Sequence, residues 1–296
     1  MAEPTRRRRV EGLVEGLVER RESAVAYTRD RVPGGNAMLE ALERERDSGG
    51  GLIAGGIAYR FFLWLLPFGL TVAAALGLWA SRDAQGVEDA AREFGMGAVA
   101  ASSVASELSG SAQSRWALLV IGLVFTSWFS VGAVRALRLA SSLAWQLKPT
   151  KVPKPAIAVL AYNALFLANY AGAAVLAWLR HALSFGPILG AVTLVCVPTA
   201  VAYVAFRSLP RRSDDWRDHL AGALVVGIGT QLVQIAVILY FAPKLESSSE
   251  LYGTLGVAAT LLLWLYVLGR LVTIALFLNA TLWERRVTGA ASTRPA

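Results

Sequence analysis

Long apolar segments alternate with short charged blocks along most of this chain. Six of the segments are long enough to span a membrane, because about 20 apolar residues cross the roughly 30 Å hydrocarbon core of a bilayer. We place them at Leu52–Ala80, Trp116–Leu139, Pro155–Leu179, Phe185–Phe206, Leu220–Ala242 and Leu251–Leu282. The pattern therefore predicts an all-α, polytopic membrane protein with six transmembrane helices.

The polar segments between and around the apolar ones divide the chain into three regions. We expect a basic cytoplasmic N-terminal region at residues 1–51, a transmembrane domain at 52–284 with an external loop at 81–115, and a cytoplasmic tail at 285–296. The N-terminal region has helical apolar spacing at residues 10–18 and predicts a second short helix from Asn36 to the glycine-rich break at Ser48–Gly51. These amphipathic helices either lie on the membrane surface or form a solvated tail.

The basic residues predict the orientation of the spans. Of the 29 Lys and Arg residues, 22 fall in the N-terminal region, in the C-terminal tail, and at the ends of spans two and four with their following loops, whereas 5 fall in the alternate loops. By the positive-inside rule, both termini are cytoplasmic. The net charge of +8 is thus assigned to cytoplasmic loops, not to nucleic-acid binding, because no basic run is interleaved with stacking aromatic residues.

Four of the predicted spans each place a strong hydrogen-bonding side chain at a similar depth. At 1.5 Å per residue, Arg60 and Asn163 lie about 12 Å from the cytoplasmic side, Gln231 about 16 Å and Arg270 about 18 Å. The spans contain no Asp or Glu, so we expect both arginines to lack a carboxylate partner there. A cavity lined by two such guanidiniums suits an anion such as a phosphate. These four residues are our substrate-binding candidates.

The arginines and Pro67 also have a purely structural interpretation. Arg60 can extend its side chain toward the interface, and both arginines can bond to free carbonyls or stack on Tyr59, Trp64 or Trp264. Pro67 predicts a kink in its helix, because it cannot bond to the carbonyl of Leu63; the alternative is a hinge.

No pattern in the sequence indicates catalysis. His181 and His219 fall on opposite sides of the membrane in this topology, and Asp214, Asp215 and Asp218 are interspersed with arginines, as in a solvated loop. Metal-dependent hydrolysis needs clustered His, Asp or Glu, and the chain has no nucleotide-binding P-loop. We therefore expect no enzyme activity, no cofactor and no metal.

Three stretches have a pattern in common with known proteins. They read AYRFFLWLLP at Ala58–Pro67, LPRRSDDWRDHLAGAL at Leu209–Leu224, and LYGTLGVAATLLLWLYVLGRLVTIALFLNATL at Leu251–Leu282. Together they resemble the YihY/BrkB family of bacterial inner-membrane proteins, over about residues 36–286. The resemblance implies six membrane helices with cytoplasmic termini, and structural roles for Tyr59, Pro67, Tyr252, Gly253, Gly256, Trp264 and Asn279. Arg60 and Arg270 depart from the family pattern, in which these positions are often not basic.

The resemblance also suggests a function. Some relatives have been linked to the export of lipid precursors, which implies membrane lipids, and anionic lipids in particular, as partners. Our main hypothesis is transport or flipping of an anionic lipid or amphiphile through a positively lined cavity. The alternative is a membrane scaffold or envelope-assembly factor without transport activity. The residues give no support to the family's other label, a tRNA-processing ribonuclease.

Overall fold

The structure, a computed structural model, describes residues 35–80, 112–149, 151–152, 154–182, 186–236 and 254–292. All regular elements in these ranges are helices: α2 (Gly35–Asp47), α3 (Gly50–Ala80), α6 (Ala112–Ala144), α7 (Pro155–Ala182), α8 (Gly186–Ser208), α9 (Arg217–Ala236) and α11 (Thr254–Ser292). The predicted all-α class is confirmed. The helix predicted near residues 10–18 and nearly all of the external loop lie outside the described residues.

Four helices in the described part of the chain are long and apolar enough to cross a membrane. These stretches are Gly50–Val72, Trp116–Ala144, Arg217–Ala236 and Ala258–Thr288. The apolar stretches of α7 and α8, Pro155–Asn169 and Leu194–Ser208, are shorter. The prediction of a multi-pass helical protein is therefore confirmed for four spans, and the count of six stays a prediction.

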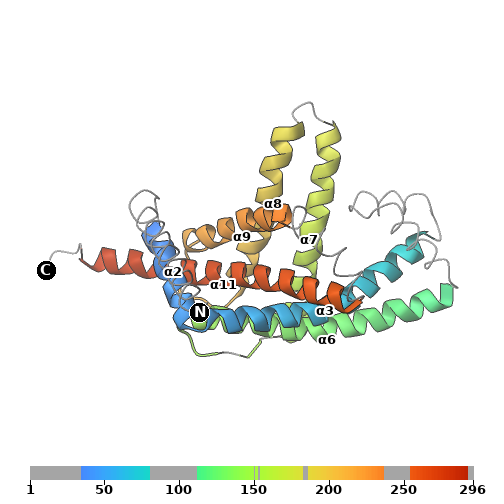
Figure 1. The fold of residues 1–296 in the computed structure, drawn as a ribbon, viewed down its shortest axis with the longest axis horizontal. Coiled ribbons are helices and arrows are strands. Elements are labelled where there is room, and N and C mark those ends of the chain that lie inside the picture. Colours follow the sequence, from blue (N-terminus) through green and yellow to red (C-terminus); the bar gives the residue numbers. More distant parts are fainter. Residues whose placement is uncertain are drawn as a thin grey trace, which may run out of the picture.

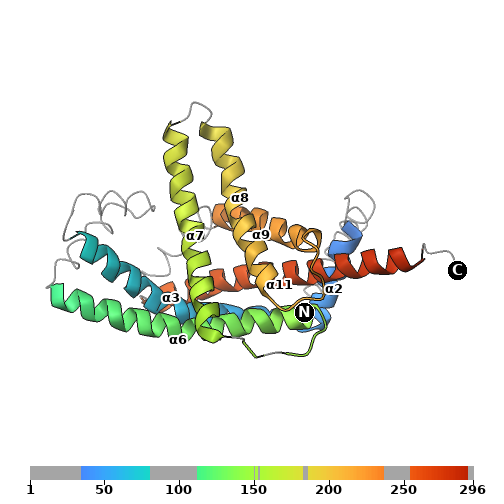
Figure 2. The same ribbon diagram turned by 180° about the vertical axis from the view of Figure 1, so that it is seen from behind.

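The helices form a layer from which one hairpin projects. α3 packs between α6 and α11, and α9 packs on the other side of α11 (Figure 1). α7 and α8 lie side by side and run across this layer (Figures 1 and 2). α2 packs on α11. The best-buried core, which includes Ala41, Ala140, Ala223, Ala275 and Phe277, therefore joins α2, α6, α9 and α11.

Glycines let α11 approach its neighbours closely. A Cβ atom on Gly269 would lie 2.7 Å from the carbonyl oxygen of Ala54 on α3. A Cβ atom on Gly222 of α9 would lie 2.5 Å from the carbonyl oxygen of Ala275. Membrane helices associate largely through such close packing of small residues, because lipid supplies no hydrophobic force between them. Glycine at these two positions thus sets the contacts of α11 with α3 and α9.

Pro67 lies inside α3, which is one helix from Gly50 to Ala80. Figure 1 shows the C-terminal part of α3, in teal, inclined to its first part, in blue. The Thr71 hydroxyl donates to the Pro67 carbonyl at 2.8 Å and lies 3.1 Å from the Thr126 hydroxyl of α6. The bend agrees with the predicted kink, since proline removes one backbone hydrogen bond from the helix.

α2 is the short helix predicted to start at Asn36. It ends where expected, at a turn in which Gly49 has a φ of 72°, a left-handed conformation that favours glycine. Two ion pairs fasten α2 to the last third of α11: Arg44 to Glu284 at 2.8 Å and Arg285 to Glu40 at 2.6 Å. α2 is therefore a docked part of the fold.

Candidate functional site

Arg270 has a carboxylate partner, so the prediction that it has none is wrong. Its guanidinium Nη1 lies 2.6 Å from Oε1 of Glu45 on α2. The Glu45 side chain is fully buried, whereas 33% of the Arg270 side chain is exposed. The prediction failed because it considered only carboxylates within the spans, and Glu45 comes from the helix that precedes the first span.

The second carboxylate oxygen of Glu45, Oε2, is buried and accepts no hydrogen bond from any residue that the structure describes. Burial raises the pKa of the Glu45 carboxyl, and the charge and hydrogen bond of Arg270 lower it in part. The pair is thus a half-satisfied buried ion pair, an arrangement in which the loss of solvation offsets much of the attraction.

The structure does not bring Arg60 and Arg270 together. The Arg270 guanidinium reaches the start of α3, where a Cβ atom on Gly51 would lie 3.8 Å from its Nη1. Gly51 precedes Arg60 by nine residues, which is about 13 Å of helix. The two arginines therefore occupy different levels.

Arg60 lies against α6. A Cβ atom on Gly132 would be 2.8 Å from its Nη1 and 3.2 Å from its Cδ, so the absent side chain makes room for the guanidinium. Arg60 is exposed, and it forms no ion pair with any residue that the structure describes. It is the predicted site residue that remains available to an anion.

Asn163 and Gln231 are engaged in packing between helices. The Asn163 amide donates to the Ser130 hydroxyl and to the Val159 carbonyl, both at 2.8 Å, and accepts from the Trp64 indole N–H at 3.2 Å. Gln231 of α9 donates to the Leu194 carbonyl of α8 at 2.6 Å. No contact among the described residues joins either amide to Arg60 or Arg270. Both amides therefore hold helices together in this structure.

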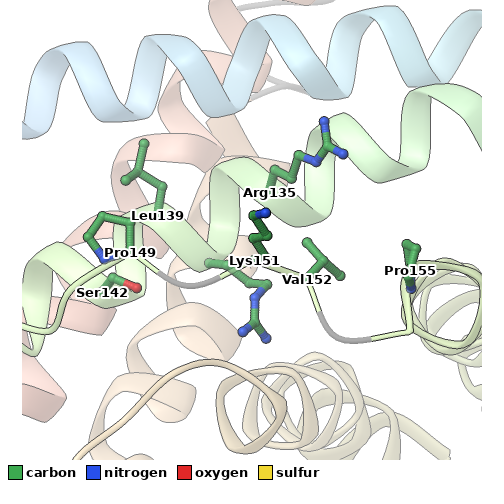
Figure 3. A pocket seen from close by; sticks show the side chains of 8 residues that line it. Arg135, Leu139, Ser142, Pro149, Lys151, Val152 and Pro155 are labelled. Carbon is green, nitrogen blue, oxygen red and sulfur yellow. The ribbon is translucent and has the colours of Figure 1, made fainter.

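A basic pocket of about 510 Å³ lies further along α6. Its lining contains three cations and no acidic residue: Arg135, Arg138, Leu139, Ser142, Pro149, Lys151, Val152 and Pro155. Figure 3 shows the Arg135 side chain rising from α6 toward α3, with Lys151 of the connecting segment beside it. Sequence reasoning used these cations only to orient the spans. The available signal was a basic segment, 135–154, without any acidic residue.

Arg60 and the basic pocket meet neighbouring positions of α6. Gly132, Arg135 and Arg138 follow one another at spacings of three residues, so each lies on the next turn from the one before it and about 60° further round the helix. The level of Gly132, where the Arg60 guanidinium rests, is about 4.5 Å along the helix from Arg135. We call this row of Arg60, Arg135, Arg138 and Lys151 the cationic face.

Of the residues to which the family pattern gives a structural role, some are buried in helix contacts, one is exposed and two lie outside the described residues. Asn279 is fully buried, and its Oδ1 accepts from the Gly222 backbone N–H at 2.7 Å, joining α11 to α9. Trp264 buries its indole N–H without a partner, and Tyr59 is exposed. Tyr252 and Gly253 lie outside the described residues, and Gly256 is described only as part of α11.

The aspartates just before and in the first turn of α9 form ion pairs with arginines. Arg286 of α11 binds Asp215 at 2.7 Å and Asp218 at 2.6 Å, and Arg211 binds Asp214 at 2.9 Å. The backbone N–H of Arg217 and then Arg286 lower the pKa of Asp215. Within the described ranges, no group of three or more His, Cys, Asp or Glu side chains could hold a metal ion.

Comparison with known proteins agrees with this architecture. A UPF0761 membrane protein of Janthinobacterium sp. (strain Marseille) is 32% identical over 93 residues, which is 30% of this chain and 21% of that protein. A UPF0761 membrane protein of Stenotrophomonas maltophilia (strain K279a) is 32% identical over 106 residues, or 36% and 22% of the two chains. The matches therefore span about a fifth of the length of these relatives. No solved structure matches the chain.

The family model described as virulence factor BrkB matches residues 41–296, which include all of the helices from α3 to α11. The relatives and the four apolar helices identify a multi-pass bacterial membrane protein. The chain belongs to the BrkB family.

Proposed function

We propose that this protein moves an anionic lipid or similar amphiphile across the bacterial inner membrane, and that the anionic headgroup binds along the cationic face of α6. The observation that carries this proposal is the basic pocket, which Arg135, Arg138 and Lys151 line without an acidic lining residue. Guanidiniums bind phosphate through paired, charge-assisted hydrogen bonds. A phosphate-bearing headgroup is therefore the ligand chemistry that this face suits best.

Arg60 extends the binding face toward the apolar part of the bundle. An arginine at the centre of a span costs about 3 kcal/mol on insertion scales. A bound anion offsets this cost, and Gly132 leaves room for the guanidinium on α6. A headgroup could thus pass from the basic pocket to Arg60 along the same helix.

An apolar pocket accompanies the cationic one. It encloses about 150 Å³ between α3, α6, α7 and α8, and its α6 residues, Ser130, Ala133, Val134 and Leu137, belong to the same stretch of that helix. Phe61, Trp64 and Phe166 line its other sides. A bundle that offers both a polar and an apolar pocket along α6 suits an amphiphile better than a free inorganic anion.

The proposal includes six spans with both termini in the cytoplasm. α7 and α8 have 28 and 23 residues, enough to cross a bilayer. In Figure 1, α7 and α8 run across the layer of α3, α6 and α11. If all six helices span the membrane, this hairpin must therefore rotate so that α7 and α8 run along the other spans. In a Cys196→Ser background, Ser184→Cys should react with an impermeant reagent from outside the cell. If α7 and α8 do not cross the membrane, Ser184→Cys should be as inaccessible from outside the cell as Lys148→Cys, and this result would contradict the six-span topology.

Lipid movement is measured with purified full-length protein in vesicles that contain a fluorescent phosphatidylglycerol, quenched by a reagent confined to the outside. Wild-type protein should speed its transbilayer movement, and Arg60→Leu combined with Arg135→Gln should reduce the rate about tenfold, as expected for the loss of one charge-assisted interaction. Lys148→Gln is the matched control, because Lys148 is an exposed cation of the same segment outside the pocket lining. Equal rates in the double variant and wild type would refute the assigned site.

The alternative, a membrane scaffold without transport activity, is tested by deleting the N-terminal region, and the position of α2 decides where the deletion should end. Since α2 is docked on α11, deletion should stop at residue 34 so that the helix is kept. A scaffold that acts through its basic N-terminal region loses its function in this deletion, whereas lipid movement through the cationic face persists.

A further inference from the structure

Glu45 is a buried acid of α2, and only one of its two carboxylate oxygens has a hydrogen-bond donor among the described residues. One carboxylate oxygen binds Arg270, and the other is buried with no donor in the described part of the chain. A buried carboxylate oxygen without a donor disfavours the ionised form. Protonation at Oε2 would remove the charge that this oxygen carries and would need no rearrangement of the Arg270 contact at Oε1.

The other polar side chains near Glu45 are paired, exposed to solvent or uncharged. On α2, Arg44 pairs with Glu284, and Arg46 and Asp47 are exposed. From α11, Arg270 and the phenol of Tyr266 face the start of α3. The first turn of α3, Gly50–Ile53, carries no charged side chain. The ionisation of Glu45 therefore acts chiefly on Arg270.

α2 does not depend on Glu45 to stay in place. Arg44 makes a two-pronged contact with Glu284, at 2.8 and 3.2 Å, and also donates to Thr281. Arg285 binds both Glu40 and the Asn36 carbonyl. These contacts lie about three to four turns further along α11 than Arg270, so neutralising Glu45 leaves the helix docked. A change at Glu45 is thus local to Arg270.

Arg270 can reach both Glu45 and a ligand. A third of its side chain is exposed, while Glu45 is fully buried behind it. An anion that approaches from the exposed side competes with the carboxylate for the same guanidinium charge. The competition ends when the carboxylate is neutral.

We propose that Glu45 is a proton-binding site that controls anion binding at Arg270. When Glu45 is ionised, it neutralises Arg270. When a proton from the aqueous phase binds at Oε2, the contact at Oε1 stays but the guanidinium charge is no longer neutralised, so Arg270 can hold an anion on its exposed side. Loss of that proton restores the carboxylate charge and expels the anion. That this anion is the transported headgroup rests on the proposed function, whereas the linkage of proton and anion at this pair does not.

The linkage is tested with sulfate, an anion that does not titrate near neutral pH. Binding to the full-length protein in detergent is followed by calorimetry across a pH series. Wild-type affinity should rise as the pH falls. Glu45→Gln, a neutral isostere, should bind about tenfold more tightly than wild type at neutral pH, a ratio equal to one pKa unit of coupling. Its affinity should no longer vary with pH.

Two further variants complete the test. Glu43→Gln replaces an exposed acid of the same helix and should keep the wild-type pH dependence. Arg270→Gln should abolish the binding that appears at low pH. If Glu45→Gln retains the wild-type pH dependence, the proposal is overturned, and the same holds if sulfate binds only as an adventitious ion, equally in wild type and Arg270→Gln.

A spectroscopic measurement on the wild-type protein covers the case in which Glu45→Gln does not fold. Infrared difference spectra between acidic and neutral pH should show the C=O band of a protonated buried carboxyl. Arg270→Gln should move its midpoint to higher pH, because it removes the cation that favours the ionised form. An unmoved midpoint, or no such band, overturns the proposal. If lipid movement fails while this linkage holds, only the proposed function is lost; if lipid moves but the pH dependence of sulfate binding is the same in Glu45→Gln and wild type, only this inference is lost.

Discussion

The Asn163→Leu substitution should reduce stability mainly because the indole N–H of Trp64 loses its hydrogen-bond acceptor. Asn163 joins α7 to α3 and α6 through two hydrogen bonds and makes a third within α7, but its three partners are not affected equally when it is replaced. Ser130 keeps its own bond to the Thr126 carbonyl at 2.7 Å, and the Val159 carbonyl keeps its place in the backbone of α7. The indole N–H of Trp64, which is only 4% exposed, loses its acceptor.

The hydrogen bonds that are lost set the expected decrease in the free energy of unfolding. Hydrogen bonds between membrane helices contribute about 0.6 kcal/mol on average, whereas a buried donor left without a partner costs about 1–3 kcal/mol. The orphaned indole therefore decides the size of the effect, and we expect a loss of about 2 kcal/mol in the free energy of unfolding. Unfolding by a denaturing detergent, followed by tryptophan fluorescence, measures this difference.

A second substitution tests the reasoning. Trp64→Phe removes the indole N–H and should make Asn163→Leu much less costly when the two are combined. Strictly additive losses in the double variant would refute the assignment of the cost to the orphaned indole. A large loss of anion binding with unchanged stability in Asn163→Leu would instead return Asn163 to the substrate site.

Two other predictions concern packing and pH. Gly222→Ala should lower the melting temperature, because the new methyl would lie 2.5 Å from the Ala275 carbonyl and 2.6 Å from the Asn279 amide; Gly56→Ala, with no atom within 4 Å, is the control, and equal melting temperatures would contradict the packing argument. Asp215 has a lowered pKa, so its contribution to stability is complete above its usual value of 3.8 and is lost as the pH falls through its lower value in the folded protein. Arg286→Gln should therefore make thermal stability less sensitive to acid below about pH 4, and an unchanged pH profile would show that Arg286 has no part in it.

Much of the fold could be predicted because its signals are local. The turn after α2 needs a glycine at Gly49, and the apolar runs of α3, α6, α9 and α11 exceed the thickness of a bilayer. The ends of helices were harder to place. α6 continues from the predicted end at Leu139 to Ala144, and α11 continues from Leu282 to Ser292. Hydropathy reports burial in lipid, whereas a helix continues through polar residues when their side chains find partners.

The candidate site was predicted only in part because its contacts link distant residues. The sequence identified Arg60 as a cation within a span, but not Gly132, which gives it room on α6. The basic segment after α6 was visible as charge, but not as one wall of a pocket. Asn163 and Gln231 were selected by depth alone, and depth does not tell whether an amide already has its partners.

The sequence by itself determined the class of this protein, because the length and apolarity of each segment decide whether it can lie in a membrane. Only the tertiary structure decided which charges meet. Glu45 and Arg270 are 225 residues apart, and no periodicity connects them. Their pairing depends on the docking of α2 against α11, and that docking results from interhelical packing and ion pairs that one segment cannot specify alone.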